Sequence, residues 1–376
     1  MPDNNSTYAY VHLGLLTVAT LVCLFSSGIA TFTEPEKLLP TELRDWRNLD
    51  EEDYDAAWDE LLPLFKKHGY QLWKRGPGLQ SHSGGHLPCD NFLFLTPDKT
   101  KNISIVRWPH FINFNGLSHA ARSINAKRDA ILRLVASGGQ GGTHLRIMRR
   151  LSSPPDILMS NNHILPFIDE ISYQDIVVLS FPKLISSLQE CLDTARDNSV
   201  EDILYMVAQT FEGAAYLHRK LIGHRDLFLN NIMVEWMPAS LRERRINRPR
   251  VYIIDFETAV DFSDDSAESE RLCKEHPFAG IVDIDTYGRP VAPELSGEIQ
   301  PYCPFKLDMW QLGSDLNDYV QTGLKEVDEF WTTLVSPIPD SRVTAADALT
   351  FLHEYLLRTS PSELHRPLPE QVSVTQ

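Results

Sequence analysis

The spacing of hydrophobic positions differs between the two halves of the chain. In the first half, residues 51–68 place apolar side chains at helical spacing, and residues 143–151 form a second, shorter helical pattern after a glycine cluster. Short apolar runs that predict strands lie at residues 92–95, 103–108, 130–135, 164–168 and 175–181. The first half is therefore predicted to be rich in strands.

The second half is predicted to be mainly helical. Residues 200–220 form a long amphipathic pattern, and helical patterns predominate from residue 307 onward. Two short strands, at 232–234 and 251–254, flank a loop between these helices. A strand-rich lobe followed by a helical lobe predicts an α+β, bilobal fold, and ligands favour the junction between two such lobes.

The organisation of the chain follows from these patterns. We expect a hydrophobic N-terminal segment, a polar linker, an N-terminal extension with the first lobe, a second lobe and a tail. These parts are expected at residues 1–33, 34–50, 51–180, 181–360 and 361–376.

The hydrophobic N-terminal run has three interpretations. Residues 13–25 and the positions just beyond them approach the length of a membrane-spanning helix, although Thr, Ser and Gly interrupt the run. Residues 28–30 resemble the cleavage site of a secretory signal. Basic residues are absent before the run and begin at Lys37 after it, which favours a single anchor at about residues 11–33 with the body of the chain in the cytosol. A leader with no membrane role is the third interpretation.

Composition and charge exclude several classes of protein. The hydrophobic fraction of 43% and the mean hydropathy of -0.23 are those of a globular chain, which excludes a disordered chain and a polytopic membrane protein. The net charge of -16 makes binding along a phosphate backbone unfavourable, so we expect no nucleic acid partner. The 5 cysteines are scattered and form no CxxC pair, which indicates a reducing, intracellular compartment rather than a disulfide scaffold or a zinc site.

The second half also carries an ordered series of polar motifs. In chain order, its members are His224-Arg225-Asp226, Asn231, Asp255-Phe256-Glu257, Ala292-Pro293-Glu294, Asp308 and Arg342. Each motif alone is a weak signal. Their order and spacing together are specific.

This series resembles the eukaryotic protein kinases, over about residues 45–355 and most clearly from residue 200 onward. It is more closely similar to a divergent protein-kinase-like family seen in mushroom-forming fungi. In that family a Trp and Gly-Tyr segment precedes the first strands, as at residues 43–46 and 68–70 here, and the stretch at 161–166 also matches. The resemblance implies a kinase N-lobe and a kinase C-lobe for the two predicted lobes.

The resemblance implies a role for each motif. Asp226 would orient the substrate hydroxyl and accept its proton, and Arg225 would join the catalytic loop to the activation segment. Asn231 and Asp255 would supply the oxygen ligands that Mg²⁺ prefers, with ATP as the phosphoryl donor. Structural roles are expected for His224, Phe256, Asp308 and the ion pair of Glu294 with Arg342.

The first lobe departs from the kinase pattern where ATP would bind. The local candidate for a glycine-rich loop, at residues 115–118, has one glycine, Gly116. Arg133 stands in the position of the strand lysine and His144 in that of the helix glutamate, so the usual ion pair cannot form. Glu257 replaces the glycine of the D-F-G motif.

A buried arginine without an anion is costly, so Arg133 should find another carboxylate. We expect Glu257 to pair with Arg133 in the nucleotide-free state, and the phosphates of ATP to compete for the same guanidinium. The residues expected to contact the nucleotide are Arg133, Met233, Asp255 and Glu257.

Three functions stay open at this point. They are an atypical protein kinase of serine/threonine type, a pseudokinase that acts as a binding or scaffold module, and a small-molecule phosphotransferase. The motifs around Glu294, Asp308 and Arg342 argue against the third. The activation segment, residues 255–294, contains Thr286 and Tyr287 as candidate phosphorylation sites.

A protein substrate or binding partner is expected, but its identity cannot be predicted. An arginine-rich insertion at 235–250 is either a solvated loop or a docking site for an acidic partner.

Overall fold

The computed structural model describes residues 39–76, 79–81, 94–96, 104–106, 110–112, 115–125, 128–184, 186–194, 198–235, 249–282 and 288–369. All of these residues except Leu39 lie in the unit Pro40–Gln376. The hydrophobic N-terminal run lies outside the described residues, so its three interpretations remain predictions. None of the helices in the described part of the chain is long and apolar enough to cross a membrane.

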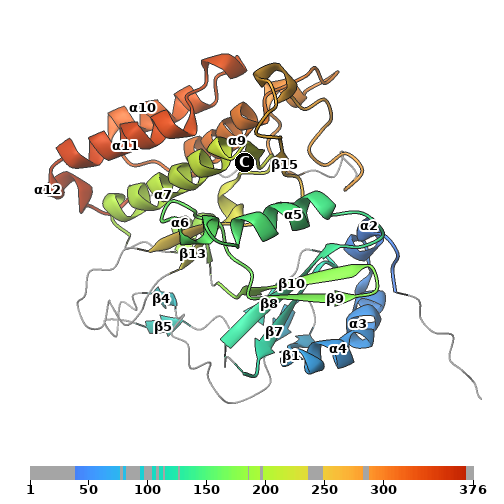
Figure 1. The fold of residues 1–376 in the computed structure, drawn as a ribbon. Helices are drawn as coiled ribbons and strands as arrows, with labels where there is room; N and C mark the ends of the chain where they lie inside the picture. Colours follow the sequence, from blue (N-terminus) through green and yellow to red (C-terminus); the bar gives the residue numbers. More distant parts are fainter. Residues whose placement is uncertain are drawn as a thin grey trace, which may run out of the picture. The chain divides into compact units, whose positions relative to one another are not determined.

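Five antiparallel strands form the main sheet, in the order β1-β7-β8-β10-β9 (Figure 1). These strands are β1 (Tyr70–Leu72), β7 (Ser118–Ser123), β8 (Arg128–Ala136), β9 (Asp169–Tyr173) and β10 (Ile176–Pro182). In β8, Ala130, Leu132 and Leu134 are buried at every second position, which leaves Arg133 on the opposite face. Arg133 lies opposite Ser118 of β7, so the register brings it to the start of that strand.

An insertion separates β1 from β7, although these two strands pair with each other. It contains two small sheets, formed by β2 (Lys74–Gly76), β3 (Leu79–Ser81) and β6 (His110–Phe111), and by β4 (Phe94–Thr96) and β5 (Ser104–Val106). The strands predicted at 92–95 and 103–108 correspond to β4 and β5. The pattern did not predict β7, because its first four residues are buried but include no large apolar side chain.

Two other expectations for the first lobe were wrong. Residues 164–168 form no strand and contribute one isolated bridge, between Ile164 and Ile253. The single helix expected at 51–68 is divided into α3 (Glu51–Glu60) and α4 (Leu62–Lys67), because Pro63 begins a new helix and cannot continue the old one.

The stretch predicted as a linker, residues 34–50, contains a short helix, α2 (Leu43–Arg47). Its Trp46 is fully buried and packs edge to face on Trp58 of α3 at a centroid distance of 6.5 Å. The described part of this stretch is therefore packed against the first lobe and does not act as a spacer.

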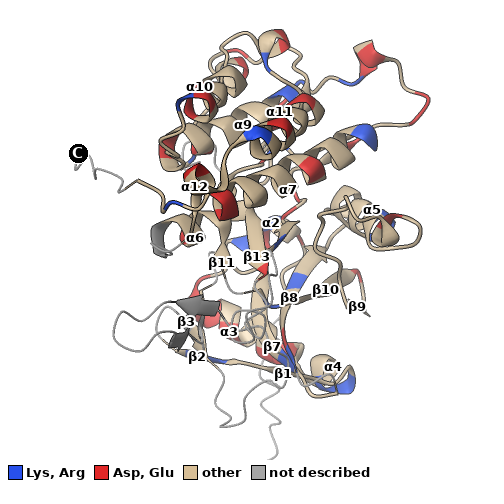
Figure 2. Ribbon diagram, turned by 90° about the vertical axis from the view of Figure 1, so that its left-hand side faces the viewer, with Lys and Arg blue, Asp and Glu red and all other residues tan. Residues whose placement is uncertain are grey.

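The C-terminal part is helical, as predicted. Its helices are α6 (Leu188–Thr194), α7 (Val200–Arg219), α9 (Pro304–Tyr319), α10 (Lys325–Leu334), α11 (Ala345–Arg358) and α12 (Pro361–Leu364). The long helix α7 confirms the pattern at 200–220. It begins at Ser199, whose hydroxyl accepts a hydrogen bond from the amide of Asp202. Figure 2 shows acidic residues spread over α7 and α10.

Short strands and single turns of 3-10 helix connect the longer helices and strands. The strands are β11 (Ser186–Ser187), β12 (Ile222–Gly223), β13 (Ile232–Glu235), β14 (Arg250–Ile253) and β15 (Val260–Asp261). The turns are η1 (Asp156–Leu158), η2 (Leu229–Asn231), η3 (Glu268–Glu270), η5 (Pro293–Leu295) and η6 (Pro339–Ser341). Figure 1 shows α5 (Gly142–Leu151) between the main sheet and the C-terminal helices. The α+β, bilobal fold expected from the sequence is confirmed.

Candidate active site

Side chains of helix α9 hold the loop from His224 to Asn231 through hydrogen bonds to its backbone amides. The carboxylate of Asp308, which is fully buried, accepts hydrogen bonds from the backbone amides of His224 at 2.9 Å and Arg225 at 2.6 Å. Two charge-assisted bonds to backbone amides fix the loop immediately before Asp226. Asp308 therefore has the position that the sequence predicted for it.

Two further residues of α9 continue this support. Gln311 accepts a hydrogen bond from the amide of Leu227 at 2.9 Å, and Asp315 accepts one from the amide of Leu229 at 2.7 Å. Burial raises the pKa of Asp315 to about 6. The sequence analysis missed both residues, although polar side chains three and seven positions after Asp308 share its helix face.

Asp226 lies at the centre of this loop, where Asn231 and Arg289 contact it. The Asn231 amide group donates to the Asp226 carboxylate at 2.7 Å and to its carbonyl oxygen at 2.8 Å. Arg289 Nε lies 3.3 Å from Asp226 Oδ1. Burial raises the pKa of Asp226, and the nearby Arg289 charge opposes that rise.

Arg289 was not predicted to be part of the site. Besides Asp226, it donates to the side-chain oxygen of Asn230 at 2.5 Å and lies over the ring of Phe228 at 4.8 Å. The loop between Asp226 and Asn231 contains no Lys or Arg. Arg289 lies 63 positions from Asp226, and the contact between them has no signal in the sequence.

Asp255 lies next to this loop because the two segments are hydrogen-bonded. The amide of Ile254 donates to the carbonyl of Asn231 at 3.0 Å. Phe256 is buried and lies edge to face against the His224 ring at 4.9 Å. Arg225 and Asp255 both have positive φ angles, 66° and 69°, which side chains other than glycine adopt only when their surroundings enforce it.

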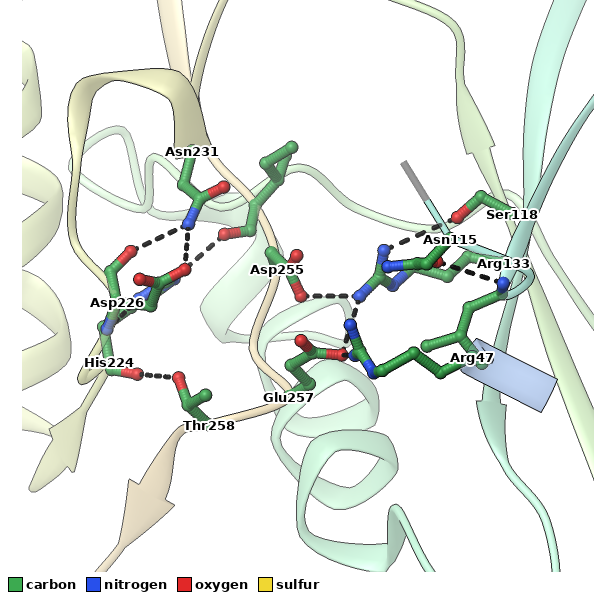
Figure 3. A network of polar contacts seen from close by, with 12 residues as sticks. Arg47, Asn115, Ser118, Arg133, His224, Asp226, Asn231, Asp255, Glu257 and Thr258 are labelled. Carbon is green, nitrogen blue, oxygen red and sulfur yellow. Dashed lines mark hydrogen bonds and ion pairs between the residues drawn. The ribbon is translucent and has the colours of Figure 1, made fainter. Parts of the chain in front are cut away.

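On the other side of the cleft, Arg133 pairs with two carboxylates (Figure 3). Its Nη2 lies 2.6 Å from Asp255 Oδ1 and 3.1 Å from Glu257 Oε2. The structure thus contains the Arg133–Glu257 pair that we expected, together with a shorter pair to Asp255. Burial raises the pKa of Asp255, but the positive charges around it, of which Arg133 contributes most, together outweigh burial and lower it overall.

His144 cannot replace the helix glutamate as an anion. It is buried on α5, and its pKa falls to about 3 because of burial and the charge of Arg133. The imidazole is therefore neutral near pH 7. The sequence analysis placed it correctly as the reason that Arg133 takes other partners.

The fourth charged residue of this cluster is Arg47, at the end of α2, which forms an ion pair with Glu257. Figure 3 shows Arg47 and Arg133 approaching the same carboxylate from two sides. Burial and the neighbouring Asp255 charge raise the pKa of Glu257 to about 7. No motif indicated Arg47, because the residues it joins are 210 positions apart.

Comparison with known proteins identifies the class of this fold. A family model described as protein tyrosine and serine/threonine kinase matches residues 145–279. The chain carries a divergent protein kinase-like domain. The match includes the loop around Asp226 and the segment around Asp255.

Curated relatives of the kinase-like domain match at low identity. Death-associated protein kinase 2 of Homo sapiens is 28% identical over 53% of this chain and 46% of its own length. "Probable serine/threonine-protein kinase mkcD" of Dictyostelium discoideum is 25% identical over 42% of this chain and 25% of its own. Serine/threonine-protein kinase ppk8 of Schizosaccharomyces pombe is 36% identical over 28% of this chain and 17% of its own.

The chain thus spans less than half the length of the curated relatives it matches. The closer resemblance to the fungal family stays a prediction.

Two structural pairs of the kinase-like domain are present as expected. Arg342, whose side chain is fully buried, donates to both carboxylate oxygens of Glu294 at 2.5 Å and 2.7 Å. Arg225 reaches the activation segment, where it donates to the carbonyl of Glu275 at 3.4 Å. Met233 is half-buried on β13, and its contact with a nucleotide stays a prediction.

Several expected features lie outside the described residues. Thr286, Tyr287 and most of the arginine-rich insertion belong to them. Arg250, at the end of that insertion, is described, and it donates to the carbonyls of Ser160 and Asn162. Arg250 therefore has partners within its own chain, and the docking of an acidic protein by the insertion stays a prediction. Among the described cysteines, Cys191, Cys273 and Cys303 form no disulfide.

A magnesium ion would have two oxygen ligands in this cleft. The described residues include no cluster of three His, Cys, Asp or Glu side chains that could hold a metal. Asn231 and Asp255 nevertheless suit Mg²⁺, which needs few protein ligands when phosphates supply the others. The Asn231 amide nitrogen bonds to Asp226, which leaves the amide oxygen for a metal, and Asp255 is kept ionised by Arg133.

Proposed function

We propose that this kinase-like domain transfers the γ-phosphoryl group of ATP to a hydroxyl group of a protein, with Mg²⁺. The observation that carries the proposal is the arrangement of Asp226. Its loop is fixed by Asp308, and Asn231 orients its carboxylate at 2.7 Å. The printed names of the curated relatives support a serine or threonine hydroxyl as the acceptor.

In the proposed reaction the acceptor hydroxyl donates its hydrogen bond to Asp226. The hydroxyl oxygen forms a bond to the γ-phosphorus, the bond from that phosphorus to the bridging oxygen of ADP breaks, and the proton passes to Asp226. Burial, which raises the pKa of Asp226, makes its carboxylate a better proton acceptor. Arg289, 3.3 Å from Asp226, places a positive charge where the transferring group would carry negative charge.

Asn231 and Asp255 would hold the magnesium ion. When bound, the ion neutralises negative charge on the phosphates. Arg133, which bonds to Asp255, would hold the phosphates on the opposite side of the cleft. The kinase-like class supports a cytosolic compartment.

One observation favours a second function, that of a pseudokinase acting as a binding module. Arg133 already pairs with two carboxylates of its own chain, at 2.6 Å and 3.1 Å. Phosphates would compete with these two carboxylates for the Arg133 guanidinium. A domain that fails to make this exchange would bind a partner without transferring phosphate.

The test is the substitution Asp226→Asn in the full chain. We measure transfer of label from γ-labelled ATP to the chain itself and to casein, and we measure ATP affinity separately by calorimetry. Loss of the proton acceptor should lower the transfer rate by a factor of about 100 or more, while ATP affinity changes little. The matched control is Asp264→Asn, which changes an exposed acid in the activation segment and should leave both quantities unchanged.

Equal transfer by the parent and by Asp226→Asn would refute the role of Asp226. A parent chain that binds ATP but transfers no phosphate would support the pseudokinase. A parent chain that binds no ATP, with or without Mg²⁺, would refute both nucleotide-based functions.

A further inference from the structure

Helix α2 is held at both of its ends by segments that adjoin strands β7 and β8 of the main sheet. At its C-terminal end, the amide of Gly116 donates to the carbonyl of Arg47 at 3.2 Å. A Cβ atom on Gly116 would lie 2.0 Å from the carbonyl oxygen of Trp46, so only glycine permits this approach. The glycine that resembled a remnant of a phosphate-binding loop is thus used to dock α2.

The N-terminal end of α2 is held in the same way. The Ser137 hydroxyl donates to the carbonyl of Thr41 at 3.3 Å. A Cβ atom on Gly138 would lie 2.2 Å from that carbonyl oxygen, and Gly138 has a φ of +60°. Two close glycine contacts and the buried Trp46 therefore determine where α2 ends, and with it the position of Arg47.

The Arg47 side chain points into the cleft, where it meets the same carboxylate as Arg133 (Figure 3). Side-chain exposure is 10% for Arg47, 16% for Arg133 and 8% for Glu257. Burying a charged pair costs desolvation energy, and a well-packed apolar pair is often as stable or more stable. The stability of the fold therefore gives no sufficient reason for a second arginine at this point.

Two guanidinium groups that converge on one anionic oxygen form a suitable site for a phosphate group. Arginine presents planar pairs of donors that match phosphate oxygens, and it stays charged in a buried site. Asp255, which bonds to Arg133 in the same cluster, is one of the two residues that would hold the metal ion of ATP. The two arginines therefore lie where the phosphates of a bound nucleotide must pass.

We infer that Arg47 is a phosphate-binding residue for ATP, supplied to the cleft by the N-terminal helix α2. In the nucleotide-free chain, Glu257 is the internal anion that both arginines share. On binding, the phosphates take the place of the Glu257 carboxylate as the partner of the two guanidinium groups. This inference rests on the proposed function in one respect, which is that the domain binds ATP in this cleft.

The experiment compares Arg47→Ala and Arg47→Lys with Arg44→Ala in the full chain. Arg44 lies on the same helix but is exposed, so it controls for helix propensity and net charge. We measure the dissociation constants of ATP and adenosine, in the presence of Mg²⁺, by calorimetry. Arg47→Ala should weaken ATP binding about tenfold and leave adenosine binding within about twofold of the parent, because one charge-assisted contact to phosphate is lost.

Arg47→Lys should lie between Arg47→Ala and the parent, since it keeps the charge without the paired donors. Arg44→Ala should bind both ligands as the parent does. A second variant, Glu257→Gln, should bind ATP more tightly, and the double variant Glu257→Gln with Arg47→Ala should lose that gain. Comparing the double variant with Arg47→Ala isolates the coupling of Glu257 to Arg47, because any loss of stability from Arg47→Ala is present in both proteins.

Three results would overturn the inference. If ATP and adenosine lose affinity equally in Arg47→Ala, the residue has a structural role only. If Arg47→Ala binds ATP as well as or better than the parent, Arg47 does not bind phosphate. Both results leave the proposed function intact, because the parent still binds ATP. A parent chain that binds neither ligand would refute the proposed function and this inference together.

Discussion

The two sides of the candidate active site differ in how their charged residues are paired. On the C-terminal side, Asp308 holds the loop amides and Glu294 pairs with Arg342, as the motifs predict. On the N-terminal side, a positive charge is present at the position of the strand lysine, but its partners differ from those of the kinase pattern. Arg133 pairs with Asp255 and Glu257, and Arg47 enters from outside the motif set.

The difference shows which charges a fold can rearrange. The partners of Asp308 are backbone amides. Substitution of another side chain neither removes these donors nor provides a replacement for the Asp308 carboxylate. In the N-terminal cluster all partners are side chains, and two arginines face two carboxylates. A change at one position of such a cluster can be compensated at another, provided that the charges still balance. The departures from the kinase pattern lie on the side where a change in one charged side chain can be compensated by another.

The largest expected effect tests the fixed side. Arg342→Met should lower the free energy of unfolding by about 3 to 5 kcal/mol, because it leaves the Glu294 carboxylate without its buried partner. Urea denaturation measures this value. The matched control is Arg358→Met, which removes an exposed pair with Glu326 and should cost less than about 1 kcal/mol.

The double variant Arg342→Met with Glu294→Gln sharpens this prediction. Removing both charges should cost less than removing Arg342 alone, because no unpaired buried charge remains. Equal losses for Arg342→Met and Arg358→Met would contradict the view that the C-terminal pairs are fixed.

The sequence predicted the fixed side of the site better than the variable side. The residues around Asp226 have defined spacings, so their order alone indicated which of them meet. The pairing of Arg133 with Glu257 was also predictable, because an arginine opposite His144 lacks an anion and Glu257 was the nearest unusual carboxylate. That inference used the cost of an unpaired charge and required no knowledge of the fold's details.

Two residues of the site had no such signal. Arg47 lies in a stretch that read as a linker, and a contact between residues 210 positions apart follows from tertiary packing alone. Gly116 was named as part of a candidate glycine-rich loop for phosphate, but it approaches the Trp46 backbone instead. The sequence cannot distinguish a glycine that approaches a phosphate from one that approaches a neighbouring backbone. β7 was missed because its sequence, SHAARS, shows no alternation of hydrophobic and polar positions.

The second prediction tests how α2 is held on the variable side. Gly116→Ala should lower the free energy of unfolding by about 2 kcal/mol, because its Cβ would overlap the Trp46 carbonyl oxygen, which belongs to backbone and cannot rotate away. Thermal denaturation and ATP affinity are measured together. The matched control is Gly142→Ala, where no atom lies within 4 Å of the new Cβ.

Both quantities should fall in Gly116→Ala if α2 positions Arg47 over the cleft. A loss of stability with unchanged ATP affinity would show that α2 supports the fold without contributing to the site. Gly142→Ala should change neither quantity appreciably.

The smallest expected effect concerns the contact between the N-terminal extension and the sheet. His119 of β7 is buried and stacks on Tyr54 of α3 at a centroid distance of 5.7 Å. Burial lowers its pKa from 6.5 to about 4. The unfolded chain therefore binds a proton near pH 6.5, whereas the folded chain does so only near pH 4. Stability from this residue is complete above pH 6.5 and is lost as the pH falls toward 4.

His119→Phe keeps an aromatic ring against Tyr54 but cannot bind a proton. At pH 7 it should lose the hydrogen bond between the imidazole and the Ala120 carbonyl, at a cost of about 1 kcal/mol. Between pH 7 and pH 4.5 the parent should lose about 2 kcal/mol more stability than His119→Phe, because the proton taken up by the unfolded parent has no counterpart in the variant. Urea denaturation at both pH values gives this difference, and the other buried histidines cancel because both proteins contain them. Parallel loss of stability in the two proteins would show that His119 titrates normally and that the extension packs on the sheet more loosely than the structure indicates.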